Sequence, residues 1–223
     1  MQISSFNSLN EIFFLQCEKY QKEDHLFFNN LNLKKFQTYT WSDTTNNVLK
    51  LAKFLNEKNI TKGDRVLLVS ENRPEWLIAD LAILLNSAIT VPNYTTYTVN
   101  DFAFTINDCK PSGLIVSTPQ LLKNILLAAK KINYNFNFII LLNQANESVA
   151  GNVVNFSTVL EKKIDIEETK IFFRGINKSL TRKDPACIIY TSGTQGTPKG
   201  VVLSHGGILK NCEGALEFLY FIK

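Results

Sequence analysis

The chain has few of the residues that build metal centres or disulfide frameworks. It contains four cysteines and two histidines in 223 residues, and no Cys-x-x-Cys pair occurs. Scattered cysteines without that spacing favour free thiols over a disulfide framework or a zinc site. Two histidines are also too few for a histidine-based centre. We therefore expect no metal site built from protein side chains.

Long apolar runs are missing as well. No stretch approaches the roughly 20 apolar residues that cross a bilayer. The amino terminus, MQISSFNSLNEIFFLQCEKY, lacks the basic start and the long apolar core of a secretion signal. We therefore expect a soluble protein of the cytoplasm without a transmembrane segment, and contact with a membrane surface stays open.

Charge of one sign is not in large excess. Twenty-four basic residues face 20 acidic ones, which gives a net charge of +4. The lysines are scattered and form no basic stripe, so we expect no nucleic-acid partner. A hydrophobic fraction of 45% and a charged fraction of 20% are typical of a folded globular protein rather than a disordered one. The length allows one large domain or two small ones.

What the sequence does contain is an alternation of strand and helix patterns. Short buried strands are predicted at 65–70, 88–93, 112–117 and 136–143. Helices are predicted between them, at 74–86, 98–109 and 118–131. Strands that alternate with helices predict an α/β fold with a largely parallel sheet.

The first 60 residues predict a helix at 8–21, strands at 25–28 and 34–41, and a second helix to residue 59. Ser8 and Glu11 have the spacing of a capping box, and Thr98 with Asp101 has the same spacing further on. We expect Ser42 to cap the second helix.

Residues 143–183 break the alternation. They include a polar stretch, NQANESVAGN, and a charged run, EKKIDIEETK, for which we expect a solvated surface loop and helix. Strands are then predicted at 186–191 and 200–204, followed by a helix at 205–221.

The stretch YTSGTQGTPKG, residues 190–200, joins these last two strands. It combines hydroxyl side chains with glycines, which let backbone N–H groups approach a ligand closely. Converging N–H groups bind anions, and the nearby Lys199 adds a mobile positive charge that suits phosphate. The composition favours a polyanion such as a nucleoside triphosphate, with a flexible surface hairpin as the alternative.

Neither of two familiar phosphate-binding loops fits this stretch. A Walker A loop requires Gly-Lys followed by Ser or Thr, whereas Lys199 lies between Pro198 and Gly200. The Gly-x-Gly-x-x-Gly fingerprint of dinucleotide-binding folds is absent too.

The residue order instead resembles the phosphate-binding signature of the AMP-forming adenylating enzymes, which include acyl-CoA synthetases, peptide-synthetase adenylation domains and luciferases. Their string is Tyr-Thr-Ser-Gly-Thr-Thr-Gly-x-Pro-Lys-Gly-Val, and YTSGTQGTPKGV departs from it only at Gln195. The resemblance covers residues 39–219, and ENRPEW at 71–76 is most similar to long-chain fatty acyl-CoA synthetases. Ser87 stands where the family usually has Gly, and Thr95 where many members have Pro.

The resemblance implies that residues 1–223 are an incomplete, amino-terminal portion of an adenylate-forming domain without its carboxy-terminal lid. It implies a ligase that activates a long-chain fatty acid with ATP and Mg²⁺, transfers the acyl group to coenzyme A, and releases AMP and pyrophosphate. The family's adenine, ribose and catalytic-lysine motifs are absent, so we assign no catalytic residue and expect this chain alone to be inactive.

By position, the resemblance implies a set of ATP-binding residues in the stretch. Ser192 and Thr194 are expected to donate hydrogen bonds to phosphate, and Lys199 to assist pyrophosphate or close the loop. The full set is Thr191, Ser192, Gly193, Thr194, Gln195, Gly196, Thr197 and Lys199.

Two other functions stay open. The chain could be a short protein that binds a nucleotide or a partner without catalysis, or an adenylating enzyme for an aryl or amino acid. Elsewhere, we expect Arg73, Glu75 and Trp76 to fix a helix start and fill the core. His205 is expected to cap a helix or pack as a buried side chain, and Asp64 to form a turn.

Overall fold

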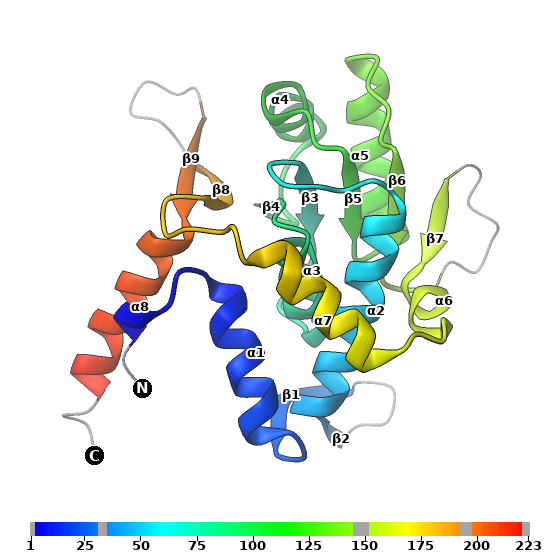
Figure 1. The fold of residues 1–223 in the computed structure, drawn as a ribbon. Helices are drawn as coiled ribbons and strands as arrows, with labels where there is room; N and C mark the ends of the chain where they lie inside the picture. Colours follow the sequence, from blue (N-terminus) through cyan, green and yellow to red (C-terminus); the bar gives the residue numbers. More distant parts are fainter. Residues whose placement is uncertain (1–2, 31–34, 145–151, 192–197, 220–223) are drawn as a thin grey trace.

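The computed structural model describes residues 3–30, 35–144, 152–191 and 198–219. It contains a seven-stranded sheet in the order β7-β6-β5-β3-β4-β8-β9 (Figure 1). The strands are β3 (Arg65–Val69), β4 (Ile89–Asn93), β5 (Gly113–Val116), β6 (Phe138–Leu141), β7 (Val153–Asn155), β8 (Pro185–Thr191) and β9 (Lys199–Ser204). All neighbouring pairs are parallel except β8 with β9, so the predicted α/β fold with a largely parallel sheet is confirmed.

Helices cover both faces of this sheet (Figure 1). On one face, the core contains side chains of α1 (Leu9–Tyr20), α2 (Trp41–Glu57), α3 (Pro74–Leu85) and α7 (Ile166–Asn177), and α1 and α7 contact α2 and α3. The other face packs against α4 (Val99–Cys109) and α5 (Pro119–Lys131). Along β3, Val66 and Leu68 belong to the first core, and Leu67 and Val69 to the second. Burial on both faces explains why the strand sequence is apolar without alternation.

The amino-terminal region adds a short helix, η1 (Ile3–Ser5), and a separate antiparallel ribbon of β1 (Asp24–Asn30) and β2 (Lys35–Thr40). Helix α2 is capped by Thr40 rather than Ser42, so that prediction was wrong. Asp43 lies three residues after Thr40 and completes a capping box, in which the Asp43 N–H donates to Thr40 Oγ1 at 3.1 Å. Ser42 lies inside the helix, which begins at Trp41, so it is past the capping position.

The other two predicted caps are present. Ser8 accepts the backbone N–H of Glu11 at 3.3 Å, and the Glu11 carboxylate accepts the N–H of Asn7 instead of that of Ser8. Thr98 and Asp101 form a full capping box at the start of α4.

Most of the expected loop, residues 145–151, lies outside the described residues, but residues 152–183 contribute more than the solvated helix that we expected. Strand β7 extends the sheet parallel to β6 and is followed by α6 (Phe156–Glu161) and α7. Phe156, Val159 and Phe173 are buried in the core. The prediction failed because β7 is only three residues long and because charged residues surround the narrow apolar stripe of α7.

Helix α8 (His205–Leu219) follows the β8–β9 hairpin. The hydroxyl of Ser204 accepts the N–H of Gly207 at 3.1 Å and so caps its first turn. His205 is instead a packed side chain, 1% exposed, whose Nδ1 accepts the backbone N–H of Leu9 at 3.3 Å.

The end of α3 explains why Ser87 stands at a position where glycine is usual in the similar family. The N–H of Ser87 donates to Leu84 at 2.8 Å and that of Ala88 to Ile83 at 3.3 Å, a Schellman motif. This motif places Ser87 in the left-handed region, with φ of 55°, and its hydroxyl finds no partner among the described residues. Glycine adopts this conformation without steric cost, which accounts for the glycine that the family usually has here.

We predict that Ser87→Gly stabilises the protein. The substitution relieves left-handed strain and removes a buried, unpaired hydroxyl, so the free energy of unfolding should rise by about 1 kcal/mol. Urea unfolding followed by circular dichroism measures this change.

Asn133→Gly is the matched control. Asn133 occupies the same position of a second Schellman motif, at the end of α5, with φ of 52°. Because Asn tolerates this conformation better than Ser, its replacement should stabilise less. An equal gain at both positions would contradict the explanation for Ser87.

Candidate functional site

The predicted binding stretch joins the two strands of the β8–β9 hairpin. The strands pair antiparallel up to Tyr190 opposite Gly200 and Thr191 opposite Lys199. Thr191 and Lys199 are exposed at the end where the strands are joined. The structure therefore brings these two predicted residues together as the last cross-strand pair. The others lie outside the described residues: Ser192, Gly193, Thr194, Gln195, Gly196 and Thr197.

The hairpin presents its two faces to different surroundings. Ile188 and Tyr190 pack with the core on the α4 and α5 side of the sheet. Cys187 and Ile189 alternate with them and line a cavity on the opposite side. This alternation follows from the two-residue period of a strand. The end of the hairpin therefore lies between a packed core on one side and the cavity on the other.

Tyr190 connects the end of β8 to helix α4. Its side chain is enclosed, since the residue is only 4% exposed and its ring meets that of Phe104 edge-on, with centroids 6.1 Å apart. Its hydroxyl donates to the carboxylate of Asp108 in the last turn of α4. Burial, followed by this bond to Asp108, raises the pKa of Tyr190. The phenol therefore stays protonated and remains a donor.

Gly200 is explained by the ring that lies across it. A Cβ at this position would lie 3.2 Å from Tyr190 Cζ and 3.0 Å from Ile188 Cγ2, closer than ordinary contact. A side chain at this position would force the tyrosine ring or Ile188 to shift by a few tenths of an ångström. The packing of Tyr190 thus favours glycine at position 200.

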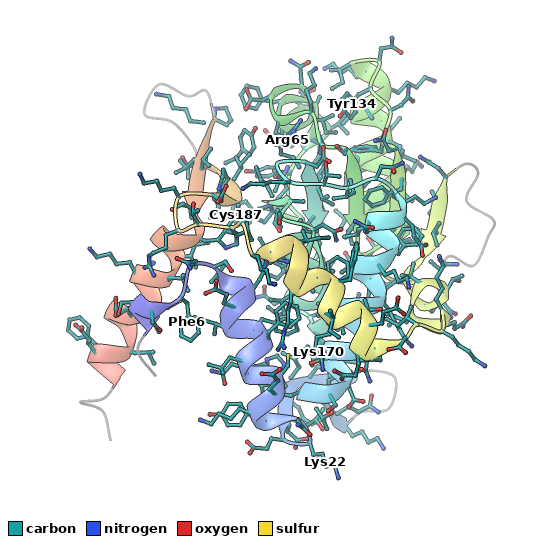
Figure 2. All side chains as sticks on the ribbon, in the orientation of Figure 1. Phe6, Lys22, Arg65, Tyr134, Lys170 and Cys187 are labelled. Atoms are coloured by element: carbon teal, nitrogen blue, oxygen red, sulfur yellow. The ribbon has the colours of Figure 1, made fainter. Side chains whose placement is uncertain are left out.

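Helix α4 also contacts the beginning of β3. Arg65, the first residue of β3, donates Nε to the carbonyl of Cys109 at 2.8 Å and Nη2 to that of Lys110 at 2.9 Å (Figure 2 labels Arg65). The last turn of α4 is therefore held at the edge of the sheet where β3 begins. Tyr190 reaches the same turn through its bond to Asp108, so the end of β8 and the beginning of β3 contact the same part of α4.

The other end of the hairpin is held by Asp184. Its carboxylate accepts the backbone N–H of Thr181 at 2.7 Å and pairs with Lys62 at 2.7 Å. The bond from Lys62, aided by Thr181, lowers the pKa of Asp184 to about 2. The backbone N–H of His205 donates to the carbonyl of Asp184 at 3.0 Å, which ties the start of α8 to the same point.

A cavity of about 470 Å³ lies between the hairpin, α3, β4 and α8. Asp80 lies in its wall and accepts the hydroxyl of Thr90 at 2.6 Å. Burial raises the pKa of Asp80 to about 6. The other residues that line the cavity are mainly apolar and include Trp76, Leu84, Pro92, Ile189, Leu203 and Ile208. Such a cavity favours apolar groups, and the Asp80 carboxylate repels an anionic group placed beside it.

The remaining predicted residues have structural roles. Arg73 precedes α3, pairs with Glu75 at 2.8 Å and donates to Asn143 at 2.7 Å, as expected for residues that fix a helix start. Trp76 packs against the core. Asp64 accepts the N–H of Thr61 at 2.9 Å and closes the predicted turn.

Sequence reasoning missed polar residues that the fold places in special positions. Asn93 ends β4 and is 7% exposed, yet neither atom of its amide has a partner among the described residues. The buried hydroxyl of Ser117, directly after β5, also has no partner among the described residues. A polar residue after each apolar strand was the available signal. For Asp108, the signal was a carboxylate in the last turn of a predicted helix, where the helix dipole disfavours it.

Within the described ranges, no three His, Cys, Asp or Glu side chains come together in a way that could hold a metal ion. In the same ranges, no helix is long and apolar enough to cross a membrane. Cys17, Cys109, Cys187 and Cys212 are free thiols.

The largely parallel sheet, with helices on both faces and an antiparallel hairpin at one edge, defines a domain of the α/β class. The model of the family described as AMP-binding enzyme matches residues 13–220, and the chain belongs to that family. The resemblance seen in the sequence is thereby confirmed.

Curated relatives include long-chain fatty acid ligases. The long-chain-fatty-acid–CoA ligase of Bacillus subtilis is 28% identical over 202 residues, which cover 82% of this chain and 35% of that protein. The peroxisomal long chain acyl-CoA synthetase 7 of Arabidopsis thaliana is 33% identical over 162 residues, covering 70% of this chain and 22% of that protein. The chain thus spans about a third or less of the length of these relatives.

Solved structures share the fold at lower identity. The luciferase-like enzyme of the Zophobas morio mealworm superimposes with a TM-score of 0.73 at 24% identity, covering 89% of this chain and 43% of that one. The acetoacetyl-CoA synthetase of Streptomyces lividans superimposes with a TM-score of 0.75 at 16% identity, covering 90% of this chain and 31% of that one.

We predict that Gly200→Ala disturbs the hairpin. The added methyl group must displace Tyr190 or Ile188, so the free energy of unfolding should fall by about 1–3 kcal/mol. Urea unfolding measures the loss. Gly175→Ala in α7 is the control, because a Cβ there meets nothing within 4 Å. That change should stabilise by about 0.5–1 kcal/mol, and similar losses in both variants would argue against the packing explanation.

We also predict a pH-dependent contribution from His205. Burial lowers its pKa from 6.5 to about 4, so the unfolded chain takes up this proton before the folded one does. The contribution of neutral His205 to the free energy of unfolding is fully present above pH 6.5. It is lost as the pH falls toward 4, by at most about 1.4 kcal/mol per pH unit.

Comparison with His205→Gln isolates this effect. Asp80 acts in the opposite direction, since its raised pKa makes the folded state take up a proton first, but it is present in both proteins. The difference in unfolding free energy between wild type and variant should shrink between about pH 7 and pH 4. A constant difference would show that His205 does not titrate in this window.

Proposed function

We propose that this chain is the amino-terminal part of an AMP-forming acid–thiol ligase that activates a long-chain fatty acid with ATP and passes it to coenzyme A. The observation that carries the proposal is the β8–β9 hairpin, whose last pair, Thr191 and Lys199, flanks the glycine and hydroxyl stretch. Membership of the AMP-binding family and the names of the curated relatives support the same function.

In the reaction we propose, a carboxylate oxygen of the acid attacks the α-phosphorus of ATP. The bond from that phosphorus to the bridging oxygen breaks, and pyrophosphate leaves with the electron pair. The thiol sulfur of coenzyme A then attacks the acyl carbonyl, loses its proton, and AMP leaves. Both steps depend mainly on positioning and on neutralising negative charge.

The hairpin supplies the charge neutralisation in this scheme. Lys199 is exposed at the end of the hairpin. Its ammonium group and the N–H groups of the glycine-rich stretch are the proposed partners of the phosphates. Mg²⁺, when bound between the phosphates, would add positive charge. We keep Thr191, Ser192, Gly193, Thr194, Gln195, Gly196, Thr197 and Lys199 as the proposed ATP-binding set and assign no catalytic residue.

The cavity beside the hairpin supports an acid with a large apolar part. The residues that line the cavity are mostly apolar and include Ile189, which lies two residues before Thr191. Since the Asp80 carboxylate repels another carboxylate, the head of the acid would lie away from Asp80 and toward the end of the hairpin. We place the ligase in the cytoplasm, where a membrane surface would supply such an acid.

We predict that the native product containing this sequence catalyses fatty-acid-dependent ATP–pyrophosphate exchange. An antibody against residues 35–144 isolates it from source cells, and its intact mass should exceed the 25.3 kDa of this chain. The product should form acyl-CoA from long-chain acids, and the 223-residue chain alone should form none. Exchange with aryl or amino acids but not fatty acids would overturn the proposed substrate, and a catalytic 25.3-kDa product would overturn the proposed dependence on further sequence.

Substitutions in that product test the hairpin. Lys199→Ala and Thr194→Ala should each lower kcat/KM for ATP by roughly 100-fold, as removal of a charge-stabilising donor does. Lys183→Ala is the matched control, because Lys183 is exposed near the opposite end of the hairpin. Unchanged exchange in both site variants would show that the hairpin does not bind the phosphates.

A further inference from the structure

We propose that Tyr190 and Asp108 form a positioning pair, which holds the end of the β8–β9 hairpin against α4 and thereby sets where the phosphates of ATP bind. The proposal rests on the proposed function for the role of the hairpin. It adds a residue, Asp108, that lies outside the glycine-rich signature, and it gives Tyr190 a role distinct from binding the ligand.

The first argument is that backbone pairing attaches the hairpin to the sheet over a short distance. The parallel pairing of β4 with β8 has one pair of partners, Thr90 with Cys187. The pairing of β3 with β4 runs over five residues, from Arg65–Ile89 to Val69–Asn93. Beyond Cys187, β8 has backbone pairing with β9 but none with β4, so side chains must hold the hairpin against the rest of the sheet.

The second argument is that Tyr190 is the side chain built to do this. Its ring lies between Phe104 of α4 and the bare backbone of Gly200 on β9. The residue is 4% exposed, and its hydroxyl ends on the Asp108 carboxylate. A hydrogen bond from a phenol to a charged acceptor is stronger than one between neutral groups. The contact thus joins both strands of the hairpin to α4.

The third argument is that Asp108 belongs to a rigid support. Arg65 holds the carbonyls of Cys109 and Lys110 in the same turn, and Phe102 and Ile106 of α4 are fully buried. A carboxylate in the last turn of a helix is disfavoured by the helix dipole. The bond from Tyr190 offsets this cost, so the residue at this position is accounted for by its partner on the hairpin.

The consequence concerns the residues next to Tyr190. Thr191 follows it directly, and Lys199 adjoins its cross-strand partner Gly200. A shift of Tyr190 therefore moves both ends of the proposed phosphate-binding stretch together. Binding groups must be held within about 0.5 Å of their productive positions, so loss of the tether should weaken ATP binding without removing any group that touches ATP.

The experiment uses the 223-residue chain and four variants that change one end of the contact or both. Tyr190→Phe removes the donor, Asp108→Ala removes the acceptor, and their combination removes both. Asp108→Asn keeps a carbonyl oxygen that still accepts the bond. Tyr134→Phe is the matched control, because Tyr134 packs against the same core, whereas its hydroxyl donates to the carbonyl of Pro111 at 2.9 Å and not to Asp108 (Figure 2 labels Tyr134).

Two measurements are made on each protein. Amide hydrogen exchange of Thr191, Lys199 and Gly200, without nucleotide, reports how firmly the end of the hairpin is held. Isothermal titration with MgATP reports binding. Tyr190→Phe and Asp108→Ala should each speed exchange at these amides by about tenfold and weaken MgATP binding by about five- to twentyfold. The double variant should be no worse than the worse single variant, because both singles break the same contact.

The controls separate positioning from general destabilisation. Asp108→Asn should be affected less than Asp108→Ala in both measurements, because an acceptor is kept although its charge is lost. Tyr134→Phe should leave hairpin exchange and MgATP binding unchanged even if its melting temperature falls as far as that of Tyr190→Phe. Equal effects of the two tyrosine variants on the hairpin would overturn the proposal.

The outcomes also distinguish this proposal from the proposed function. If wild type binds MgATP but Tyr190→Phe binds it equally well, the positioning pair is refuted and the function stands. If wild type binds no MgATP, the proposed ATP site of the hairpin fails in this chain. Hydrogen exchange then decides by itself whether Tyr190 and Asp108 hold the hairpin, and unchanged exchange would refute that as well.

Discussion

Burial of the central strands on both faces is the constraint on which the rest of this structure depends. A parallel strand such as β3 has no solvent face, so its side chains must alternate between two separate cores. Each core then requires its own helices, α1, α2, α3 and α7 on one side and α4 and α5 on the other. The positions of α3 and α4 follow from this requirement, and with them the cavity wall at Asp80 and the support at Asp108.

The hairpin that carries the signature lies where this regular arrangement ends. Strand β8 is the last parallel strand, β9 returns antiparallel, and the pairing of β8 with β4 is brief. One face of the hairpin joins the core through Tyr190, and the other lines the cavity through Ile189. The exposed pair of Thr191 and Lys199 thus projects from a base that is packed on one side and open on the other. That arrangement suits the proposed site, in which phosphate would be held rigidly and an apolar acid admitted beside it.

Much of the fold was predictable because local patterns and tertiary burial agree in its centre. The strands at β3, β4, β5 and β6 are continuous apolar runs, and helices α3 and α5 begin with proline in the first turn. Predictions failed where local signals were weak or ambiguous. Thr40 and Ser42 are both good caps, and Asp43 decides between them by its spacing. Strand β7 is too short for a pattern, and only its pairing with β6 makes it a strand.

By itself, the sequence determined the fold class, the family and the stretch where phosphate is proposed to bind, because glycine, hydroxyl and lysine residues in that order are a local property of the chain. Only the tertiary structure decided what holds that stretch in place. Tyr190 and Asp108 are 82 residues apart, and nothing local relates them. Ser87 and Gly200 show the same distinction. Both residues can be read from the sequence, but the left-handed backbone of Ser87 and the Tyr190 ring beside Gly200 arise only on folding. The physical reason is that side-chain contacts between distant segments depend on how helices pack on the sheet, which no single segment encodes.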